Sequence, residues 1–373
     1  MKNTFKLTTL FNIPIDINYT WFVIVGLVIF TLANGYFPLA APELGPLAWW
    51  LMAVISAFLL FASLLAHELA HSLIAIRNNL PIHGITLFIF GGVAHMNREP
   101  QSPKVELKMA IAGPIMSFAL AIIFYLITNL LTLFHFSTVF FSITTYLFII
   151  NFMVGTFNLI PGFPLDGGRV LRAVLWHFCK DIRQATSVAS TIGKGFAFFL
   201  MAVGFLKLIG GAILSGIWLL FLGLFLAEAA DVSYKQVVMR KTLGGITVEK
   251  CMTKKVIIVS PQVTLDALVD HFFLKLRHAS FPVMEDDMIL GIVTLHDVKS
   301  VPKENWLLTT AKDIMLPIGE GFIVSKDMDV INALAKMASN KIHRLMVVDE
   351  GKLIGFISQR DIVKLFEMKS EIG

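Results

Sequence analysis

Long apolar segments follow one another over the first 235 residues of the chain. Six of them reach or approach the length of about 20 residues that a helix needs to cross a bilayer. They lie at approximately 19–37, 47–76, 107–133, 138–160, 186–208 and 211–230. From about residue 240 onward, charged and apolar positions are mixed as they are in soluble domains. The pattern predicts an α-helical, polytopic membrane domain of about six spans at 1–235, followed by a soluble C-terminal part.

Composition and charge agree with a membrane protein and exclude other classes. Hydrophobic residues make up 56% of the chain and charged residues only 15%, whereas roughly a quarter of a soluble domain is charged. The net charge of +5 comes from loop residues without a compact basic patch, so no nucleic-acid partner is expected. The two cysteines, Cys179 and Cys251, have no spacing typical of a disulfide framework or a thiolate metal site.

The distribution of lysine and arginine predicts the orientation of the spans. These residues concentrate before the first span, between the second and third, between the fourth and fifth, and after the sixth. The alternate loops carry almost none. Because positive residues mark cytoplasmic loops, we expect a multi-pass protein of the cell membrane with both termini and the soluble part in the cytoplasm.

One apolar segment is too short to cross the bilayer. Residues 82–96, IHGITLFIFGGVAHM, combine β-forming residues with a Gly91-Gly92 interruption. This pattern predicts a β-hairpin. Its hydrophobicity indicates that the hairpin dips into the membrane under cover of the helices, because exposed backbone polar groups are not tolerated there.

The soluble part contains an internal repeat. Each copy has Val-Ser, an amphipathic helix, a short apolar strand, an acidic turn, a Gly-led strand, and Thr or Ser three residues before Asp. Equivalent residues lie 64 positions apart, namely Gly291 and Gly355, and Asp297 and Asp361. Such repetition predicts a duplicated α/β module of the order β-α-β-β-α. We expect the two copies to occupy 245–310 and 311–373.

Ionisable side chains interrupt the second apolar span. His67, Glu68 and His71 form the pattern H-E-x-x-H within FASLLAHELAHSLIAIR. Positions i and i+4 share a helix face, so both imidazoles can bind one divalent metal while Glu68 takes a proton from a metal-bound water. Ionisable groups inside a membrane span are costly and usually functional. The pattern therefore predicts a metal-hydrolase site.

A catalytic zinc site usually takes three protein ligands and a water, so a third ligand is expected. The candidate is Asp166 in NLIPGFPLDGGRV, at the cytoplasmic end of the fourth span, where prolines and glycines break the helix. Taken alone, the segment is more typical of an ordinary turn in which Asp166 caps the next helix. The incomplete H-E-x-x-H pair on the same membrane side favours the ligand interpretation.

In this order, the motifs resemble those of the site-2 protease family of intramembrane zinc metalloproteases. The matching segments are AHELAHSLIA, the Gly-Gly hairpin, AIAGP at 110–114 and NLIPGFPLDGGRV. The resemblance implies that His67, His71 and Asp166 bind one catalytic Zn²⁺ and that Glu68 is the general base. It also implies regulated intramembrane proteolysis, in which transmembrane segments of single-span substrates are cleaved.

Three further expectations concern the surroundings of this site. The resemblance implies that Asn158 positions the substrate or stabilises the oxyanion. Many relatives carry Asn where this chain has Ser117, so no site role is expected there, and Gly113 with Pro114 is interpreted as a helix-packing contact or kink. Because a membrane helix hides its own carbonyls, we expect the hairpin to capture a locally unwound substrate by adding a strand to its edge.

The soluble repeats resemble paired cystathionine-β-synthase (CBS) domains. The resemblance implies candidate adenine-nucleotide contacts, for ATP or AMP, at Thr294 and Asp297 and at Ser358 and Asp361. The hydroxyl would meet phosphate and the carboxylate would accept hydrogen bonds from ribose. Many such domains bind no ligand and dimerise instead, so a nucleotide site and a homodimer contact both remain open.

Two alternative functions would also use the H-E-x-x-H residues of the second span. A CBS-regulated transporter or channel would use the buried His/Glu/Asp cluster as an ion path, with access from both sides of the membrane. A prenyl-protein processing enzyme also uses an intramembrane H-E-x-x-H, but its third ligand is Glu. The Asp in a proline-broken segment disfavours that alternative.

Overall fold

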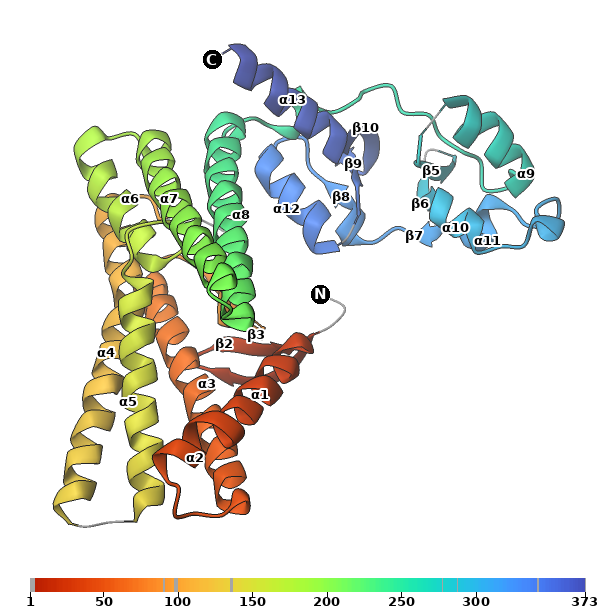
Figure 1. Ribbon diagram of the computed structural model, residues 1–373. Coiled ribbons are helices and arrows are strands. Elements are labelled where there is room, and N and C mark those ends of the chain that lie inside the picture. The colour runs from red at the N-terminus through yellow and green to blue at the C-terminus, as the bar shows by residue number, and fades with distance from the viewer. Residues whose placement is uncertain are drawn as a thin grey trace. The chain divides into compact units, whose positions relative to one another are not determined.

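The computed structural model divides the chain into two compact units, Met1–Val237 and Val238–Gly373. Both are drawn in Figure 1. The structure describes residues 4–89, 91–96, 100–134, 137–276, 278–286, 288–340 and 342–372. Phe90, at the tip of the expected hairpin, lies outside the described residues.

Six helices in the described part of the chain are long and apolar enough to cross a membrane. They are α1 and its continuation α2 (Thr20–Thr31 and Phe37–Ala40, joined by a π-helical turn at Leu32–Tyr36), α3 (Pro46–Arg77), α4 (Pro103–Leu133), α5 (Thr138–Asn158), α7 (Ile182–Ile209) and α8 (Ile213–Leu243). The predicted polytopic α-helical domain is thereby confirmed. A shorter helix, α6 (Asp166–Cys179), follows the proline-broken segment and packs against α4 and α7.

A four-stranded sheet accompanies the helices. Its strands are β1 (Thr4–Leu10), β2 (Ile13–Asn18), β3 (Ile82–Phe88) and β4 (Gly91–Met96), in the order β1-β2-β3-β4. The hairpin predicted at 82–96 is confirmed as β3 and β4, which pair antiparallel. Strand β3 also pairs in parallel with β2, so β4 forms one edge of this sheet.

The N-terminal strands were not expected, because the segment before the first span has a polar composition. Ile13, Ile15 and Ile17 alternate along β2 and are all buried, which is the period-2 pattern of a half-buried strand. Phe11 and Asn12 adopt positive φ angles of 52° and 63° and form the two-residue turn of the β1–β2 hairpin, as turns of this length require.

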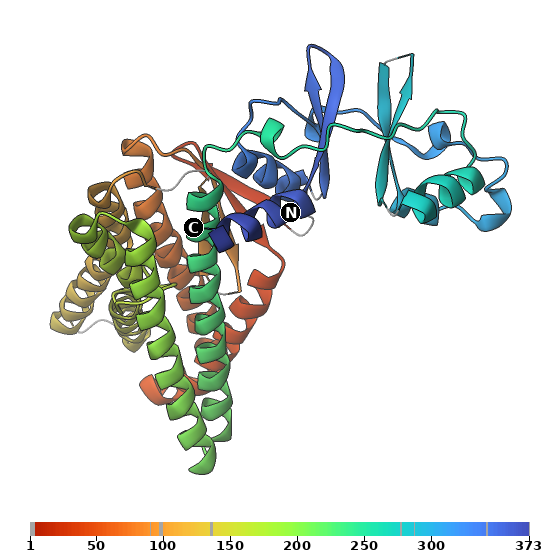
Figure 2. The ribbon, with the colours of Figure 1, turned by 90° about the horizontal axis from the view of Figure 1, so that it is seen from above.

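The second unit contains two α/β lobes. Figure 2 shows their hairpins side by side. The first has β5 (Ser280–Glu285), β6 (Met288–Thr294) and β7 (Leu316–Pro317) with α9 (Leu265–Ala267, continuing as a π-helix over Leu268–Leu274), α10 (Leu295–Lys299) and α11 (Ala311–Ile314). The second has β8 (Ile323–Val324), β9 (Arg344–Asp349) and β10 (Lys352–Ser358) with α12 (Val330–Asn340) and α13 (Gln359–Ile372). Each lobe has its own apolar core, which confirms the duplicated α/β module.

Candidate metal centre

Two imidazoles and one carboxylate converge between α3 and the start of α6. His67 and His71 lie one helical turn apart on α3, and both are buried. Their Nε2 atoms are 3.1 Å apart, and Oδ2 of Asp166 lies 3.1 Å from Nε2 of His67 and 3.0 Å from Nε2 of His71. The three atoms thus form a nearly equilateral triangle and could hold a metal ion.

The second nitrogen of each imidazole is fixed by α4. Nδ1 of His71 lies 2.6 Å from the carbonyl oxygen of Met109, which can only accept a hydrogen bond, so the proton of a neutral His71 resides on Nδ1. Its Nε2 lone pair then points toward the other two candidate ligand atoms. Nδ1 of His67 lies 2.8 Å from the hydroxyl of Ser117.

The chemistry of this donor set fits zinc. Without a cation, the Nε2 lone pair of His71 would face another imidazole and a carboxylate at about 3 Å, and these groups would repel one another. Nitrogen and carboxylate oxygen are common zinc ligands at about 2.0–2.2 Å, and tetrahedral coordination at that length separates ligand atoms by roughly 3.3–3.5 Å. Outer hydrogen bonds, such as the one that Nδ1 of His71 donates to the Met109 carbonyl oxygen and the one between Nδ1 of His67 and Ser117, orient the imidazoles of metal sites.

Gly113 has a closer relation to the site than a helix-packing contact. A Cβ atom at this position would lie 2.2 Å from Nε2 of His71 and 2.4 Å from Nε2 of His67. Only a residue without a side chain lets the α4 backbone pass so close to the candidate ligand atoms. The Gly-Pro pair was visible in the sequence, but its distance from the imidazoles was not. The same holds for Ser117, one turn later on α4.

The first turn of α6 aims Asp166 at the imidazoles. Leu165, not Asp166, occupies the N-cap, and the cap makes no side-chain hydrogen bond, so the simple capping interpretation does not describe this residue. A Cβ at Gly167 would lie 2.3 Å from the carbonyl oxygens of Leu159 and Ile160. The helix start is therefore seated directly on the backbone of the proline-broken segment.

A cavity of about 240 Å³ opens beside the candidate ligands. Glu68 lines it together with His71 and Asp166. The predicted general base therefore lies in the same cavity as two of the candidate metal ligands. The edge strand β4 supplies another wall through residues Gly92–Ala94 and Met96. Arg169 also lines the cavity; in the sequence it was considered only as a marker of membrane orientation.

Asn158 is placed differently. It is the last residue of α5, and its Nδ2 donates a hydrogen bond to the carbonyl oxygen of Val154 in the same helix, at 3.1 Å. The residues that line the cavity do not include it. Its expected contact with the substrate stays a prediction.

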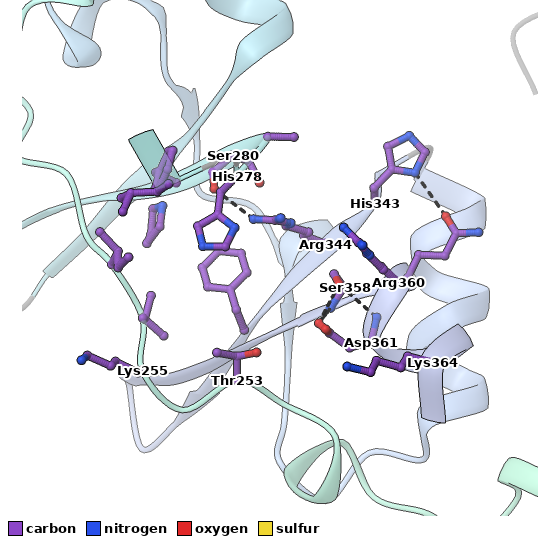
Figure 3. Close-up of a pocket in the computed structure, with 18 of the residues that line it drawn as sticks. Thr253, Lys255, His278, Ser280, His343, Arg344, Ser358, Arg360, Asp361 and Lys364 are labelled. Carbon is purple, nitrogen blue, oxygen red and sulfur yellow. Dashed lines mark hydrogen bonds between the residues drawn. The ribbon is translucent and has the colours of Figure 1, made fainter. Parts of the chain in front are cut away.

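A second cavity, of about 1160 Å³, lies between the two lobes of the second unit and is shown in Figure 3. Ser358 and Asp361 line it, whereas the equivalent Thr294 and Asp297 are outside its lining. The hydroxyl of Ser358 donates to Oδ2 of Asp361 at 2.6 Å, and Thr294 does the same to Asp297 at 2.7 Å. Both pairs thus also cap the helix that follows.

Six basic side chains contribute to the lining of this second cavity, together with apolar residues and the carboxylates of Asp361 and Glu367. The basic residues are Lys255, His278, His343, Arg344, Arg360 and Lys364. Burial lowers the pKa of Arg344, although the carboxylate of Asp361 opposes that shift, and a guanidinium remains charged at neutral pH. One of its nitrogens donates to the carbonyl oxygen of Ser280 at 3.2 Å, which links the two lobes.

Comparison with known proteins assigns both units to families. The model of peptidase family M50 matches residues 55–138 and 134–203, and the CBS domain model matches residues 248–304 and 311–367. The chain is 31% identical over 379 residues to zinc metalloprotease MJ0392 of Methanocaldococcus jannaschii, covering 100% of this chain and 99% of that protein. The solved structure of a site-2 protease from the same organism is 28% identical, with a TM-score of 0.42, covering 62% of this chain and 95% of that one.

Six apolar helices and these relatives agree on a multi-pass membrane protein. Membership of a zinc metalloprotease family also favours the peptidase hypothesis over the transporter or channel alternative, which used the same buried residues. The full-length relative covers both the membrane domain and the soluble repeats. The chain therefore belongs to peptidase family M50, the site-2 protease family of zinc metalloproteases, and carries a C-terminal pair of CBS domains.

Proposed function

We propose that the protein is an intramembrane zinc endopeptidase that cleaves the transmembrane segments of single-span membrane proteins and so releases their cytoplasmic parts. The observation that carries this proposal is the triangle formed by Nε2 of His67, Nε2 of His71 and Oδ2 of Asp166. Glu68 lines the cavity next to it. Three candidate ligands with an adjacent carboxylate make up the minimum set for metal-assisted peptide hydrolysis.

The residues divide the work as follows. His67, His71 and Asp166 would hold the zinc ion, which when bound supplies a Lewis acid that polarises the scissile carbonyl and lowers the pKa of a water. Glu68 accepts a proton from the attacking water and later delivers it to the leaving amine. Met109 and Ser117 keep the two imidazoles in orientation through their Nδ1 atoms.

The substrate would reach this centre as an extended segment along β4. Strand β4 is an edge of the four-stranded sheet and lines the cavity with Glu68. A membrane helix that unwinds locally exposes backbone N–H and C=O groups, which need partners inside the bilayer. Pairing with β4 would satisfy them and hold the scissile bond in the cavity by strand addition.

The sequence pattern suggests the domain boundaries, and the loop charges suggest the membrane orientation. We propose a protease domain at 1–235 and CBS domains at 245–310 and 311–373, with both termini and the CBS pair on the cytoplasmic side of the cell membrane. This orientation rests on the concentration of lysine and arginine in one set of loops. With this orientation, the released cytoplasmic part of the substrate and the CBS pair would be in the same compartment.

Replacing Glu68 by Gln tests the proposal. The purified full chain is reconstituted in liposomes with a labelled single-span substrate, and cleavage is followed by gel electrophoresis. Removal of the general base should lower the cleavage rate by about 10²- to 10⁴-fold, while zinc content stays unchanged because Glu68 is not one of the three candidate ligands. Glu43→Gln makes the same chemical change in an exposed loop and should leave the rate unchanged. Cleavage by Glu68→Gln at the wild-type rate would contradict the proposal.

We also propose that the cavity between the CBS domains binds one adenine nucleotide, such as ATP or AMP. Basic side chains in its lining suit a phosphate chain, and Asp361, which also lines it, would accept ribose hydrogen bonds. Asp361→Asn should weaken binding of a fluorescent ATP analogue at least tenfold, because one charge-assisted acceptor is lost. Asp297→Asn is the matched control in the other repeat and should bind normally. Equal losses in both variants, or in neither, would contradict a single site at Asp361.

A further inference from the structure

Arg169 places a cation in the cavity beside the candidate metal centre. It lies three residues after Asp166 on α6, and residues so spaced share one helix face. Both line the cavity with Glu68. A guanidinium offers five N–H donors and remains charged at any physiological pH. The cavity thus contains a hydrogen-bond donor in addition to the groups that would hold zinc and move protons.

The packing of α6 does not account for this side chain. Among the residues that the structure describes, none makes a hydrogen bond or ion pair with the Arg169 guanidinium. Arg172, one turn further along, is the opposite case: it is buried, pairs with Glu106, and lies over the ring of Phe163 at 5.0 Å. One arginine of α6 thus joins helices. The other makes no hydrogen bond or ion pair among the described residues, and its charge interacts electrostatically with the carboxylate of Glu68 in the same cavity.

The expected alternative donor is engaged elsewhere. The Nδ2 of Asn158 donates to the carbonyl oxygen of Val154 and is absent from the cavity lining. A substrate segment on β4 would run along Gly92 and Ala94, which line the cavity that Arg169 also lines. A carbonyl of that segment near the imidazoles of α3 would therefore lie within the cavity that Arg169 lines.

We propose that the Arg169 guanidinium binds the carbonyl oxygen of the scissile peptide bond and stabilises the negative charge that develops on it. This inference rests on the proposed peptidase function. The water oxygen bonds to the carbonyl carbon, one water proton passes to Glu68, and the C=O π pair moves to the oxygen that Arg169 contacts. The C–N bond then breaks, and the nitrogen takes the proton back from Glu68. As the C–N bond breaks, the electron pair on that oxygen re-forms the C=O bond. The products are a carboxylic acid and an amine, and transfer of the acid proton to the amine gives a carboxylate and an ammonium group.

Kinetics of Arg169→Met in the full-length protein test this role. Loss of one donor to a developing oxyanion costs about 10²- to 10³-fold in kcat, and we expect a loss of that size with KM within about threefold of wild type. Arg169→Lys keeps the charge without the planar fork and should recover part of the rate. Zinc content should match wild type in both variants. Arg77→Met, at the exposed end of α3, is the control and should retain full activity.

A binding measurement separates this role from a structural one. A peptide phosphinate mimics the tetrahedral anion, so Arg169→Met should weaken its binding by about the factor lost in kcat. Binding of the uncleaved substrate, measured in the Glu68→Gln background, should change little. An unchanged kcat, a loss of zinc, or equal weakening of both ligands would overturn the role of Arg169. The two proposals fail on different results. The peptidase function fails if Glu68→Gln cleaves at the wild-type rate, whereas the role of Arg169 fails on the results named above while Glu68→Gln stays inactive.

Discussion

Gly113→Ala should abolish the metal centre. The added methyl group would lie 2.2 Å and 2.4 Å from the two Nε2 atoms that are candidate zinc ligands, well inside van der Waals contact. Either α4 or both imidazoles must move, and α4 also carries the hydrogen-bond partners Met109 and Ser117. Loss of a single outer partner costs 10- to 100-fold in metal affinity, so we expect a weakening of more than about 100-fold and a comparable loss of cleavage.

Zinc content of the purified protein, measured by mass spectrometry, provides the readout for Gly113. Gly26→Ala is the matched control, because Gly26 also lies within a membrane helix but no heavy atom is within 4 Å of its added Cβ. The control should keep wild-type zinc and activity. If Gly113→Ala also keeps both, then the approach of α4 to the imidazoles described here is wrong.

Of the substitutions discussed, Arg172→Met should lower the free energy of unfolding most. The side chain of Glu106 is fully buried and accepts a hydrogen bond from Nε of Arg172 at 2.6 Å, with a second contact from Nη2 to the same oxygen. The other oxygen, Oε2, has no hydrogen-bond partner in the described part of the chain. Removing the guanidinium would leave a buried charge without compensation, which typically costs about 3–5 kcal/mol.

Unfolding of detergent-solubilised protein by denaturant measures this loss. The double variant Glu106→Met/Arg172→Met should be more stable than the single variant, because both charges are removed together. Lys326→Met breaks an ion pair with Asp349 in the soluble unit, where both side chains are more than a third exposed, and should have a small effect because water screens such pairs. A double variant no more stable than Arg172→Met would contradict a charge-burial origin of the effect.

Much of the architecture follows from local pattern. Each membrane helix contains a predominantly apolar segment that reaches or approaches the length that a bilayer requires. The duplicated module is visible as a repeat of spaced glycine and aspartate positions. The candidate ligands were also accessible, because helix periodicity alone places His67 and His71 on one face. Asp166 required a further chemical argument, namely that two imidazoles do not complete a catalytic zinc site.

The remaining features depend on contacts between distant segments. The alternation of Ile13, Ile15 and Ile17 was a local sign of strand β2, but its parallel pairing with β3 joins segments about 70 residues apart and could not be inferred from that pattern. Gly113 and Ser117 gain their significance from the crossing of α4 over α3, and sequence spacing cannot reveal that crossing. In the sequence, Arg169 contributed only to the prediction of membrane orientation. Its position in the cavity depends on where α6 packs. The CBS cavity is lined by Ser358 and Asp361 but not by the equivalent Thr294 and Asp297. The sequence repeat could not predict this difference, because both copies carry the same pattern.

X-ray absorption at the zinc edge of the purified full-length protein tests the central claim most directly. We expect one zinc per chain, coordinated by two imidazole nitrogens and otherwise by oxygen, and we expect the metal to be lost in Asp166→Ala. A spectrum that requires sulfur or a third imidazole, or full zinc retention in Asp166→Ala, would contradict a site built from His67, His71 and Asp166.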